Sequence, residues 1–382
     1  MSQTSNFDIL PVRWLFTGGD DGFIRKYDFF NSINGDTLLT LSQKHGLIDT
    51  IQKSGVMIVL LQNGSINLYT VRHDEGTCHH VFRGHEKPVS ALALGGNERL
   101  FLSGSWDRKA ILWDLDTGAK TREYTAFNSH ITSIKFQPNS SSATAATTSS
   151  ISETKQTAAE PSTGAAAVAS TNDMDVSSDE KIQQQESQQI NVSALSEIGN
   201  IAAVLSFDGK ISIIDGRDSN DAVKTFAPVN PTPPWGVSVV WSPDGKRIYC
   251  GRRNGTVDEW DFAEGRLLQN IRLPRDSGPV TSVFCMPNNR HIVCGSFDNI
   301  RLWDLQYTAP DLSMDGTVGS IHNEFEMTQA IVPFAIIPGH HGGVISSFVT
   351  DAKCKYMVSA SGNRGWDGIS NNMCLLYSVT TQ

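Results

Sequence analysis

Hydrophobic and polar residues alternate in short runs along most of the chain, and turns rich in Gly, Asp and Asn separate these runs. The clearest set is VSALAL at 89–94, RLFLSGS at 99–105, AILWDL at 110–115 and KTREYTAF at 120–127. A period of two residues places successive side chains on opposite faces of a strand. The pattern therefore predicts four antiparallel strands joined by tight turns, which is one blade of a β-propeller.

The same unit recurs, and the third run of each copy ends in an aromatic or large apolar residue that is most often followed by Asp. These endings fall at Tyr27–Asp28, Tyr69, Trp113–Asp114, Ile214–Asp215, Trp260–Asp261, Trp303–Asp304 and Tyr377. Where no extra segment intervenes they are about 42 to 46 residues apart, close to the WD40 period. We expect a single domain over residues 1–382, an all-β, seven-bladed WD40 β-propeller.

Two segments interrupt the repeat. Residues 139–192 are rich in Ser, Ala and Gln, and they contain seven acidic residues, two lysines and almost no large apolar residues. Such a segment cannot bury enough surface to fold, so we expect a disordered acidic insertion in blade four. Residues 306–333 separate the third and fourth strands of blade six, and they are expected to form a loop insertion, either plain or used to bind a partner.

The N-terminus leaves one strand unassigned. Only FDIL at 7–10 precedes the first repeat unit, which starts near Trp14. This piece is either the first strand of blade one or the outer strand that closes blade seven, and it cannot be both. In the second case the first blade is incomplete and leaves an exposed sheet edge.

A buried polar network is expected in the third unit. A buried indole N–H requires an acceptor, and Trp113 closes the third strand. His85 precedes the first strand, Asp107 lies in the turn after the second, and Ser103 or Ser105 lies between them. We interpret His85, Ser103, Asp107 and Trp113 as one hydrogen-bonded chain with a structural role. The alternative is that they are only turn residues and a core aromatic.

Catalytic and metal-binding motifs are not evident. The sequence contains no G-x-S-x-G elbow, phosphate-binding loop or H-E-x-x-H helix. His79 and His80 lie among other potential ligands, but adjacent strand residues point to opposite faces and cannot easily share one ion. We therefore expect no catalytic residue, no cofactor, no metal and no small-molecule substrate.

Surface recognition is then the remaining function. The turns between second and third strands share one face of a WD40 ring with the loops that precede first strands. Exposed aromatic and arginine side chains dominate interface energies. The candidates at these tips are Trp106, Arg108, Arg252, Arg253, Phe297, Arg364 and Trp366, with Phe207 in the same face. The alternatives are that the tryptophans pack against neighbouring blades and that Arg252 and Arg253 are merely solvated.

The net charge and the cysteine content limit the kinds of partner that we expect. The net charge of −9 argues against direct nucleic-acid binding through phosphates and favours a basic protein partner. The six cysteines lie in apolar runs without a C-x-x-C pair, and we expect them to be reduced and buried. We see no signal peptide and no apolar run of membrane-spanning length, so a membrane role is not expected.

Several stretches go beyond the general repeat. The runs FTGGDDGFIRKYDFF at 16–30, LFLSGSWDRKAILWDLDTG at 100–118 and SGNRGW at 361–366 resemble the WD40-repeat, suppressor-of-Ty subunit family of the fungal SAGA transcription coactivator. The resemblance covers the chain outside the two interruptions. It implies a non-catalytic nuclear subunit that recruits or hands over TATA-binding protein at RNA polymerase II promoters, with other SAGA subunits as further partners.

Two other functions would each require a sequence feature that is not evident. A WD40 substrate receptor or scaffold subunit of another complex, such as a ubiquitin ligase, would need a docking segment for the ligase outside the ring, and none is evident. An enzyme that uses the central channel would need converging carboxylates or histidines at the channel mouth, and the turns offer no repeated acid–base pair.

Overall fold

The computed structural model describes the strands of the chain and most of the turns that join them. The described residues are 14–18, 23–28, 39–42, 47–53, 56–61, 63–71, 76–96, 99–125, 127–138, 201–217, 224–227, 235–274, 277–297, 299–306, 329–330, 334–337, 340, 343–351, 354–362 and 372–379. Within these ranges every regular element is a β-strand.

The described strands form seven sheets, which we number in chain order; five have four or more strands and two have three. The first three sheets contain β1 (Trp14–Gly18), β2 (Phe23–Asp28) and β3 (Leu39–Ser42); β4 (Leu47–Lys53), β5 (Val56–Leu61), β6 (Ile66–Val71) and β7 (Gly76–Phe82); and β8 (Val89–Leu94), β9 (Leu100–Ser105), β10 (Ala110–Asp114) and β11 (Lys120–Tyr124). The fourth and fifth contain β12 (Ile131–Phe136), β13 (Ile201–Ser206), β14 (Ile211–Asp215) and β15 (Lys224–Phe226); and β16 (Gly236–Trp241), β17 (Arg247–Arg252), β18 (Thr256–Asp261), β19 (Leu267–Arg272) and β23 (Gln329–Ala330). The sixth and seventh contain β20 (Ser282–Cys285), β21 (His291–Gly295), β22 (Ile300–Asp304) and β24 (Phe334–Ile337); and β25 (Val344–Thr350), β26 (Tyr356–Gly362) and β27 (Met373–Ser378).

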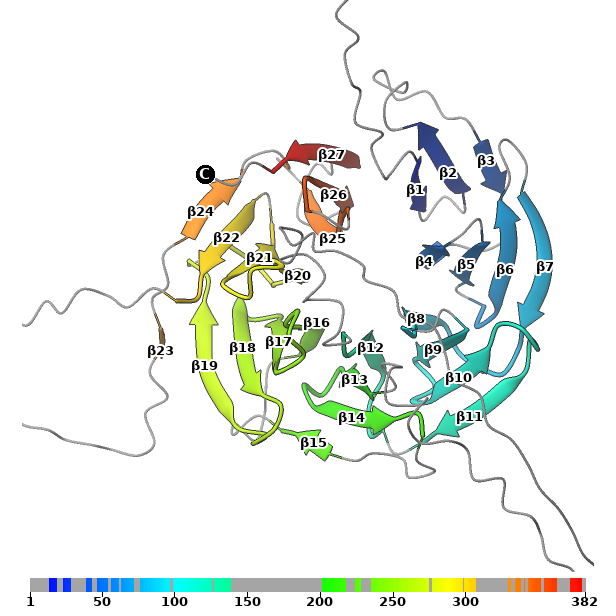
Figure 1. Ribbon diagram of the computed structural model, residues 1–382, viewed down its shortest axis with the longest axis horizontal. Coiled ribbons are helices and arrows are strands. Elements are labelled where there is room, and N and C mark those ends of the chain that lie inside the picture. The colour runs from blue at the N-terminus through cyan, green and yellow to red at the C-terminus, as the bar shows by residue number, and fades with distance from the viewer. Residues whose placement is uncertain are drawn as a thin grey trace, which may run out of the picture.

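The sheets are arranged around a common centre (Figure 1). In the second to sixth sheets the first strand lies nearest the centre and later strands lie progressively outward. The innermost strands of consecutive sheets contact one another from β4 through β8, β12, β16 and β20 to β25. The prediction of an all-β propeller is therefore confirmed.

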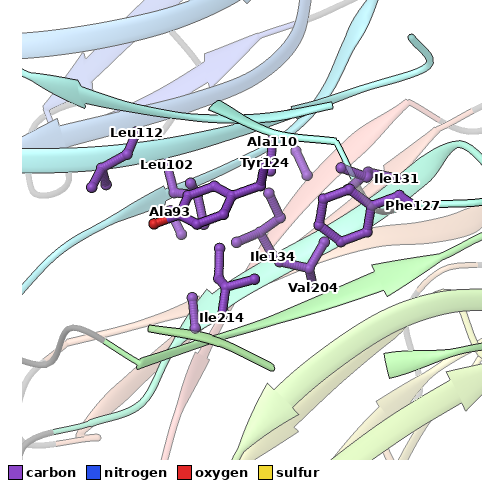
Figure 2. Packing of buried hydrophobic residues seen from close by; sticks show 12 residues of the cluster. Ala93, Leu102, Ala110, Leu112, Tyr124, Phe127, Ile131, Ile134, Val204 and Ile214 are labelled. Atoms are coloured by element: carbon purple, nitrogen blue, oxygen red, sulfur yellow. The ribbon is translucent and has the colours of Figure 1, made fainter. Parts of the chain in front are cut away.

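The hydrophobic core lies between neighbouring sheets. Phe101 and Leu102 are adjacent in β9 and point to opposite faces, so Phe101 joins the cluster shared with the second sheet and Leu102 joins the cluster shared with the fourth. Figure 2 shows the latter cluster, where Leu102 and Leu112 face Ile134 and Val204. Burying both faces explains why the second strand of a unit is apolar almost throughout.

The small residues of the repeat allow close packing. A Cβ atom at Gly104 in β9 would lie 2.5 Å from Ile131 and 2.7 Å from Ile134 of the fourth sheet. Gly251 holds the corresponding position in β17, where a Cβ atom would lie 2.9 Å from Val280. A glycine at the end of the second strand therefore lets the inner strand of the next sheet approach closely.

The two predicted interruptions fall mostly outside the described residues. The segment 139–192 is not described, and the strands that flank it, β12 and β13, pair with each other. Of the predicted loop 306–333, residues 307–328 and 331–333 lie outside the described part. Its residues 329–330, however, form β23, which pairs in parallel with β19 of the neighbouring fifth sheet. This part of the segment is thus a strand rather than a plain loop.

The first and seventh sheets each have three described strands. By comparison with the third sheet, β1 to β3 correspond to second, third and fourth strands, because the acidic residues Asp20 and Asp21 come between β1 and β2 in the sequence as Asp107 comes between β9 and β10. In the same comparison β25 to β27 correspond to first, second and third strands. Residues 7–10 are not described, so both assignments of FDIL stay open.

Candidate partner-binding face

Four side chains of the third sheet form one hydrogen-bonded chain. The indole N–H of Trp113 donates to Ser103 Oγ at 2.8 Å. Ser103 Oγ lies 2.8 Å from His85 Nε2, and His85 Nδ1 lies 2.9 Å from Asp107 Oδ2. Because a carboxylate only accepts, His85 Nδ1 carries the proton, and in the neutral ring Nε2 accepts the Ser103 hydroxyl. This hydrogen-bonded network connects the loop before β8, which carries His85, and the β9–β10 turn, which carries Asp107, to the buried side chains of Ser103 in β9 and Trp113 in β10.

Asp107 is held as a carboxylate in this network. Its burial raises the pKa, but the hydrogen bonds from His85 and from the backbone N–H groups of Glu86 and Lys109 outweigh burial and lower the pKa of Asp107 overall. The two backbone bonds, at 3.1 and 2.9 Å, fix the loop before β8 and the β9–β10 turn to the same side chain.

Other sheets hold only parts of this network. In the fifth sheet Cys250 stands where Ser103 stands, and the buried indole N–H of Trp260 has no hydrogen-bond partner among the described residues. In the seventh sheet His340 Nε2 lies 2.5 Å from Ser359 Oγ. The network thus varies between sheets that share one strand pattern.

One face of the propeller is built by a repeated backbone contact. The N–H of a residue one or two positions after a second strand donates to the carbonyl of a residue in the segment that precedes the first strand of the same sheet. The pairs are Trp106 to Pro88 at 3.0 Å, Phe207 to His130 at 2.7 Å, Arg253 to Trp235 at 3.0 Å and Phe297 to Ser277 at 3.1 Å. These eight residues therefore lie at the same end of four consecutive sheets. We call this end the turn face.

Four aromatic rings contact one another in a row across the turn face, from the third to the fifth sheet. The Trp106 and His130 ring centroids are 5.6 Å apart with nearly parallel planes. His130 lies 6.3 Å from Phe207, and Phe207 lies 4.1 Å from Trp235. The guanidinium carbon of Arg253 lies 4.0 Å from the Trp235 ring centroid, which is a cation–π contact. We call these five residues the aromatic ladder.

Most of the predicted tip residues lie on the turn face, but their side chains differ in how far they are exposed to solvent. Trp106 is 49% exposed and forms one end of the ladder, and Arg253 is exposed at the other end. Arg108 is exposed and has a φ of 68° in the β9–β10 turn. Phe297 is half-buried, because its ring packs on Gly278. Arg364 and Trp366 lie outside the described residues.

The prediction that Arg252 is displayed at a turn tip is wrong. Arg252 is 1% exposed because it is the last residue of β17, which is buried on both faces. Its guanidinium pairs with Asp258 Oδ2 at 2.6 Å and donates to the carbonyl of Gly209 at 2.7 Å. Arg252 therefore holds the β13–β14 turn, which carries Phe207, against the fifth sheet.

Sequence reasoning missed two members of the ladder, Trp235 and His130. Trp235 is 41% exposed. Both precede the first strand of a unit, a position that we considered only for structural histidines such as His85. The signal that identifies them is register: each lies just before its first strand, next to an aromatic or arginine tip.

The expectation of six buried cysteines holds only in part. Cys250, Cys285 and Cys294 are buried, whereas Cys78 and Cys374 are exposed and Cys354 is intermediate. Burial raises the pKa of Cys250 to about 12, which keeps this thiol protonated. Among the residues that the structure describes, no group of three or more His, Cys, Asp or Glu side chains is arranged to hold a metal ion. The described part of the chain also contains no helix long and apolar enough to cross a membrane.

Comparison with known proteins identifies the family. A model described as the SPT8 beta propeller matches residues 8–63 and 57–380. The SAGA complex subunit Spt8 of Schizosaccharomyces pombe is 38% identical over 423 aligned residues, which cover 97% of this chain and 75% of that protein. The SAGA complex subunit SPT8 of Saccharomyces cerevisiae is 31% identical over 424 residues, covering 96% and 69%. A periodic tryptophan protein 2 homologue of Neurospora crassa is 46% identical over 57 residues, or 15% of this chain. The chain belongs to the Spt8 β-propeller family.

Proposed function

We propose that this chain is a non-catalytic subunit of a SAGA-type transcription coactivator complex and that it acts in the nucleus. The observation that carries this proposal is similarity over nearly the whole chain to two proteins named as SAGA complex subunits. A binding role agrees with the described residues. Most of their buried polar groups pair with one another, and the two exposed tryptophans, Trp106 and Trp235, lie on the turn face. Exposed aromatic side chains of this kind dominate interface energies.

We propose further that the chain binds TATA-binding protein and hands it over at RNA polymerase II promoters, beside other SAGA subunits. The family resemblance suggests this partner. The charge supports it, because a chain with net charge −9 attracts a basic, DNA-binding protein. Such attraction raises the rate of encounter and weakens as salt screens it.

The test is retention of purified TATA-binding protein by the purified full chain over a salt series. A matched variant replaces the seven acidic residues of 139–192 with their amides, which removes charge without shortening the chain. We expect binding that weakens steadily with salt. Circular dichroism and a cooperative unfolding transition show that each chain is folded. If a folded chain retains no TATA-binding protein at low salt, direct recognition is wrong and a scaffold role inside the complex remains.

We also propose that the seven sheets are the seven blades of one ring and that 139–192 is an insertion in the fourth blade. The pairing of β12 with β13 on either side of that segment supports the insertion. Limited proteolysis tests it: cleavage within 139–192 should leave two fragments that stay associated through the β12–β13 pairing. Fragments that separate without denaturant would contradict it.

A further inference from the structure

The aromatic ladder is a preformed apolar strip on an exposed face. Its two tryptophans, Trp106 and Trp235, are 49% and 41% exposed, although each ring already packs against a neighbouring ring. Rigid aromatic groups with exposed edges bind a partner at low entropic cost, because few rotamers are lost on binding. The strip crosses three sheets, so an extended segment fits it better than a single small ligand.

The charges around the ladder are positive, in contrast to the chain as a whole. Lys87, Arg108 and Arg253 are exposed, and none forms an ion pair with a carboxylate in the described part of the chain. The nearby carboxylates each have a lysine within ion-pair distance. The exposed Glu86 lies 3.6 Å from Lys109, which also pairs with Glu123 at 3.1 Å, and the half-buried Asp208 lies 3.9 Å from Lys210.

The buried carboxylate of Asp107 does not offset the positive charge around the ladder. Asp107 is 3% exposed at its side chain and is occupied by His85 at 2.9 Å. Arg253 is exposed although its guanidinium carbon lies 4.0 Å from the Trp235 ring centroid, so its N–H groups can still donate to a carboxylate. The ladder therefore combines exposed aromatic surface with cations that lack a carboxylate partner in the described part of the chain.

A single-stranded nucleic acid fits this arrangement poorly. Bases bind by stacking on open aromatic faces. Here Trp235 contacts both Phe207 and Arg253, at 4.1 and 4.0 Å, and His130 lies against Trp106 with an interplanar angle of 7°. Each ring of the ladder already contacts a neighbouring ring, which leaves less open ring surface for stacking bases.

We propose that the aromatic ladder binds an extended acidic peptide segment of a partner protein, one in which carboxylates alternate with aromatic or leucine side chains. The apolar side chains lie against the edges of Trp106 and Trp235. Carboxylates pair with Arg253 at one end and Arg108 at the other. This site is separate from the contact for TATA-binding protein, because a basic protein is repelled by the cations that border the ladder.

The experiment selects short peptides from a random displayed library on the purified full chain, and then measures dissociation constants of the enriched peptides by fluorescence anisotropy. The test variants are Trp106→Ala/Trp235→Ala and the charge reversal Arg253→Glu. Leu376→Ala is the matched apolar control, because Leu376 is 50% exposed in β27, away from the ladder. Arg266→Ala is the matched cation control, because its side chain is 65% exposed and it pairs with Glu264.

We expect enrichment of peptides with Asp or Glu next to Phe, Trp or Leu. Their affinity should fall at least about tenfold in the double tryptophan variant and in Arg253→Glu, and stay unchanged in both controls. Retention of TATA-binding protein by the double variant should equal that of the unaltered chain, so the two proposals succeed or fail separately. Binding of a labelled oligothymidine is measured on the same proteins, to test the ladder as a nucleic-acid site.

Three results would overturn the proposal. The first is enrichment of basic or neutral peptides, or no enrichment by a folded chain. The second is acidic peptides whose affinity is the same for the unaltered chain and the double tryptophan variant. The third is ladder-dependent binding of oligothymidine that is tighter than binding of any selected peptide, which would assign the face to nucleic acid.

Discussion

The third and fifth sheets share one strand order and one kind of apolar core, but they pair their buried polar groups in different ways. In the third sheet a hydrogen-bonded chain joins the indole of Trp113 to the turn carboxylate of Asp107. In the fifth sheet Cys250 takes the serine position, and the buried polar contact at the turn is an ion pair between Arg252 and Asp258.

A second polar cluster in the fifth sheet surrounds the buried carboxylate of Glu259. The Glu259 carboxylate accepts hydrogen bonds from Arg247 at 2.5 Å, from the hydroxyl of Tyr249 at 3.1 Å, and from Gln269. Burial, reinforced by the charge of Glu259, raises the pKa of Tyr249, so its hydroxyl stays protonated and donates.

The difference teaches that the repeat specifies apolar faces and turn lengths, while the polar group at a given position can change. Most buried polar groups are paired, and the partner can be a hydroxyl, an amide or an ion, whereas the Trp260 indole N–H has no partner among the described residues. The residues at the turn tips can vary even more, because their side chains contribute little to the hydrophobic core. Stability and binding should therefore respond to different residues.

The largest effect on stability is expected from breaking the ion pair of the fifth sheet. Arg252→Met leaves the buried Asp258 carboxylate without its cation and should cost about 3–5 kcal/mol. Urea unfolding followed by tryptophan fluorescence measures this. Adding Asp258→Leu to the variant should recover part of the loss, since the uncompensated charge is then removed. A loss under about 1 kcal/mol for Arg252→Met would mean that water reaches the pair.

A smaller effect is expected from the two equivalent tryptophans. Trp113→Phe and Trp260→Phe remove similar volume, but only Trp113 loses a hydrogen bond, to Ser103. Trp113→Phe should therefore be more destabilising by about 1 kcal/mol. The two variants are compared in one urea series. Equal losses would show that the indole hydrogen bond in the third sheet adds no net stability.

The acid sensitivity of the third sheet follows from Asp107. Its pKa is lowered in the folded chain, so its contribution is present above its ordinary pKa of about 3.9 and is lost as the pH falls through the lower folded value. Asp107→Asn should lower stability at neutral pH and flatten the decline at pH values below about 4. Urea midpoints at several pH values test this. A parallel decline in both proteins would remove Asp107 from the explanation.

The smallest effect on stability is expected at the turn face. Trp235→Ala removes stacking at a site that is 41% exposed, and it should cost about 0.5–1 kcal/mol. Thermal unfolding of this variant should be close to that of the unaltered chain. A loss as large as that of Trp113→Phe would show that the ladder is part of the core.

Much of the fold could be predicted from the sequence, because period-two alternation and the recurring aromatic endings directly encode buried strands. The candidate face was harder to predict. Arg252 and Arg253 are adjacent and look alike, yet β17 ends between them, so one is buried and the other is exposed. Trp235 acquires its role from Phe207 of the preceding sheet, a contact that no single repeat contains. The parallel pairing of β23 with β19 is likewise a contact between distant segments.

The most direct test of this account compares Trp113→Phe and Trp235→Ala as binders of the selected acidic peptides, at a temperature where both are folded. We predict that Trp113→Phe keeps the dissociation constant of the unaltered chain despite its lower stability. Trp235→Ala should raise that constant by about tenfold despite near-normal stability. If the buried variant loses affinity and the exposed one keeps it, the separation of a stabilising core from a binding turn face is contradicted.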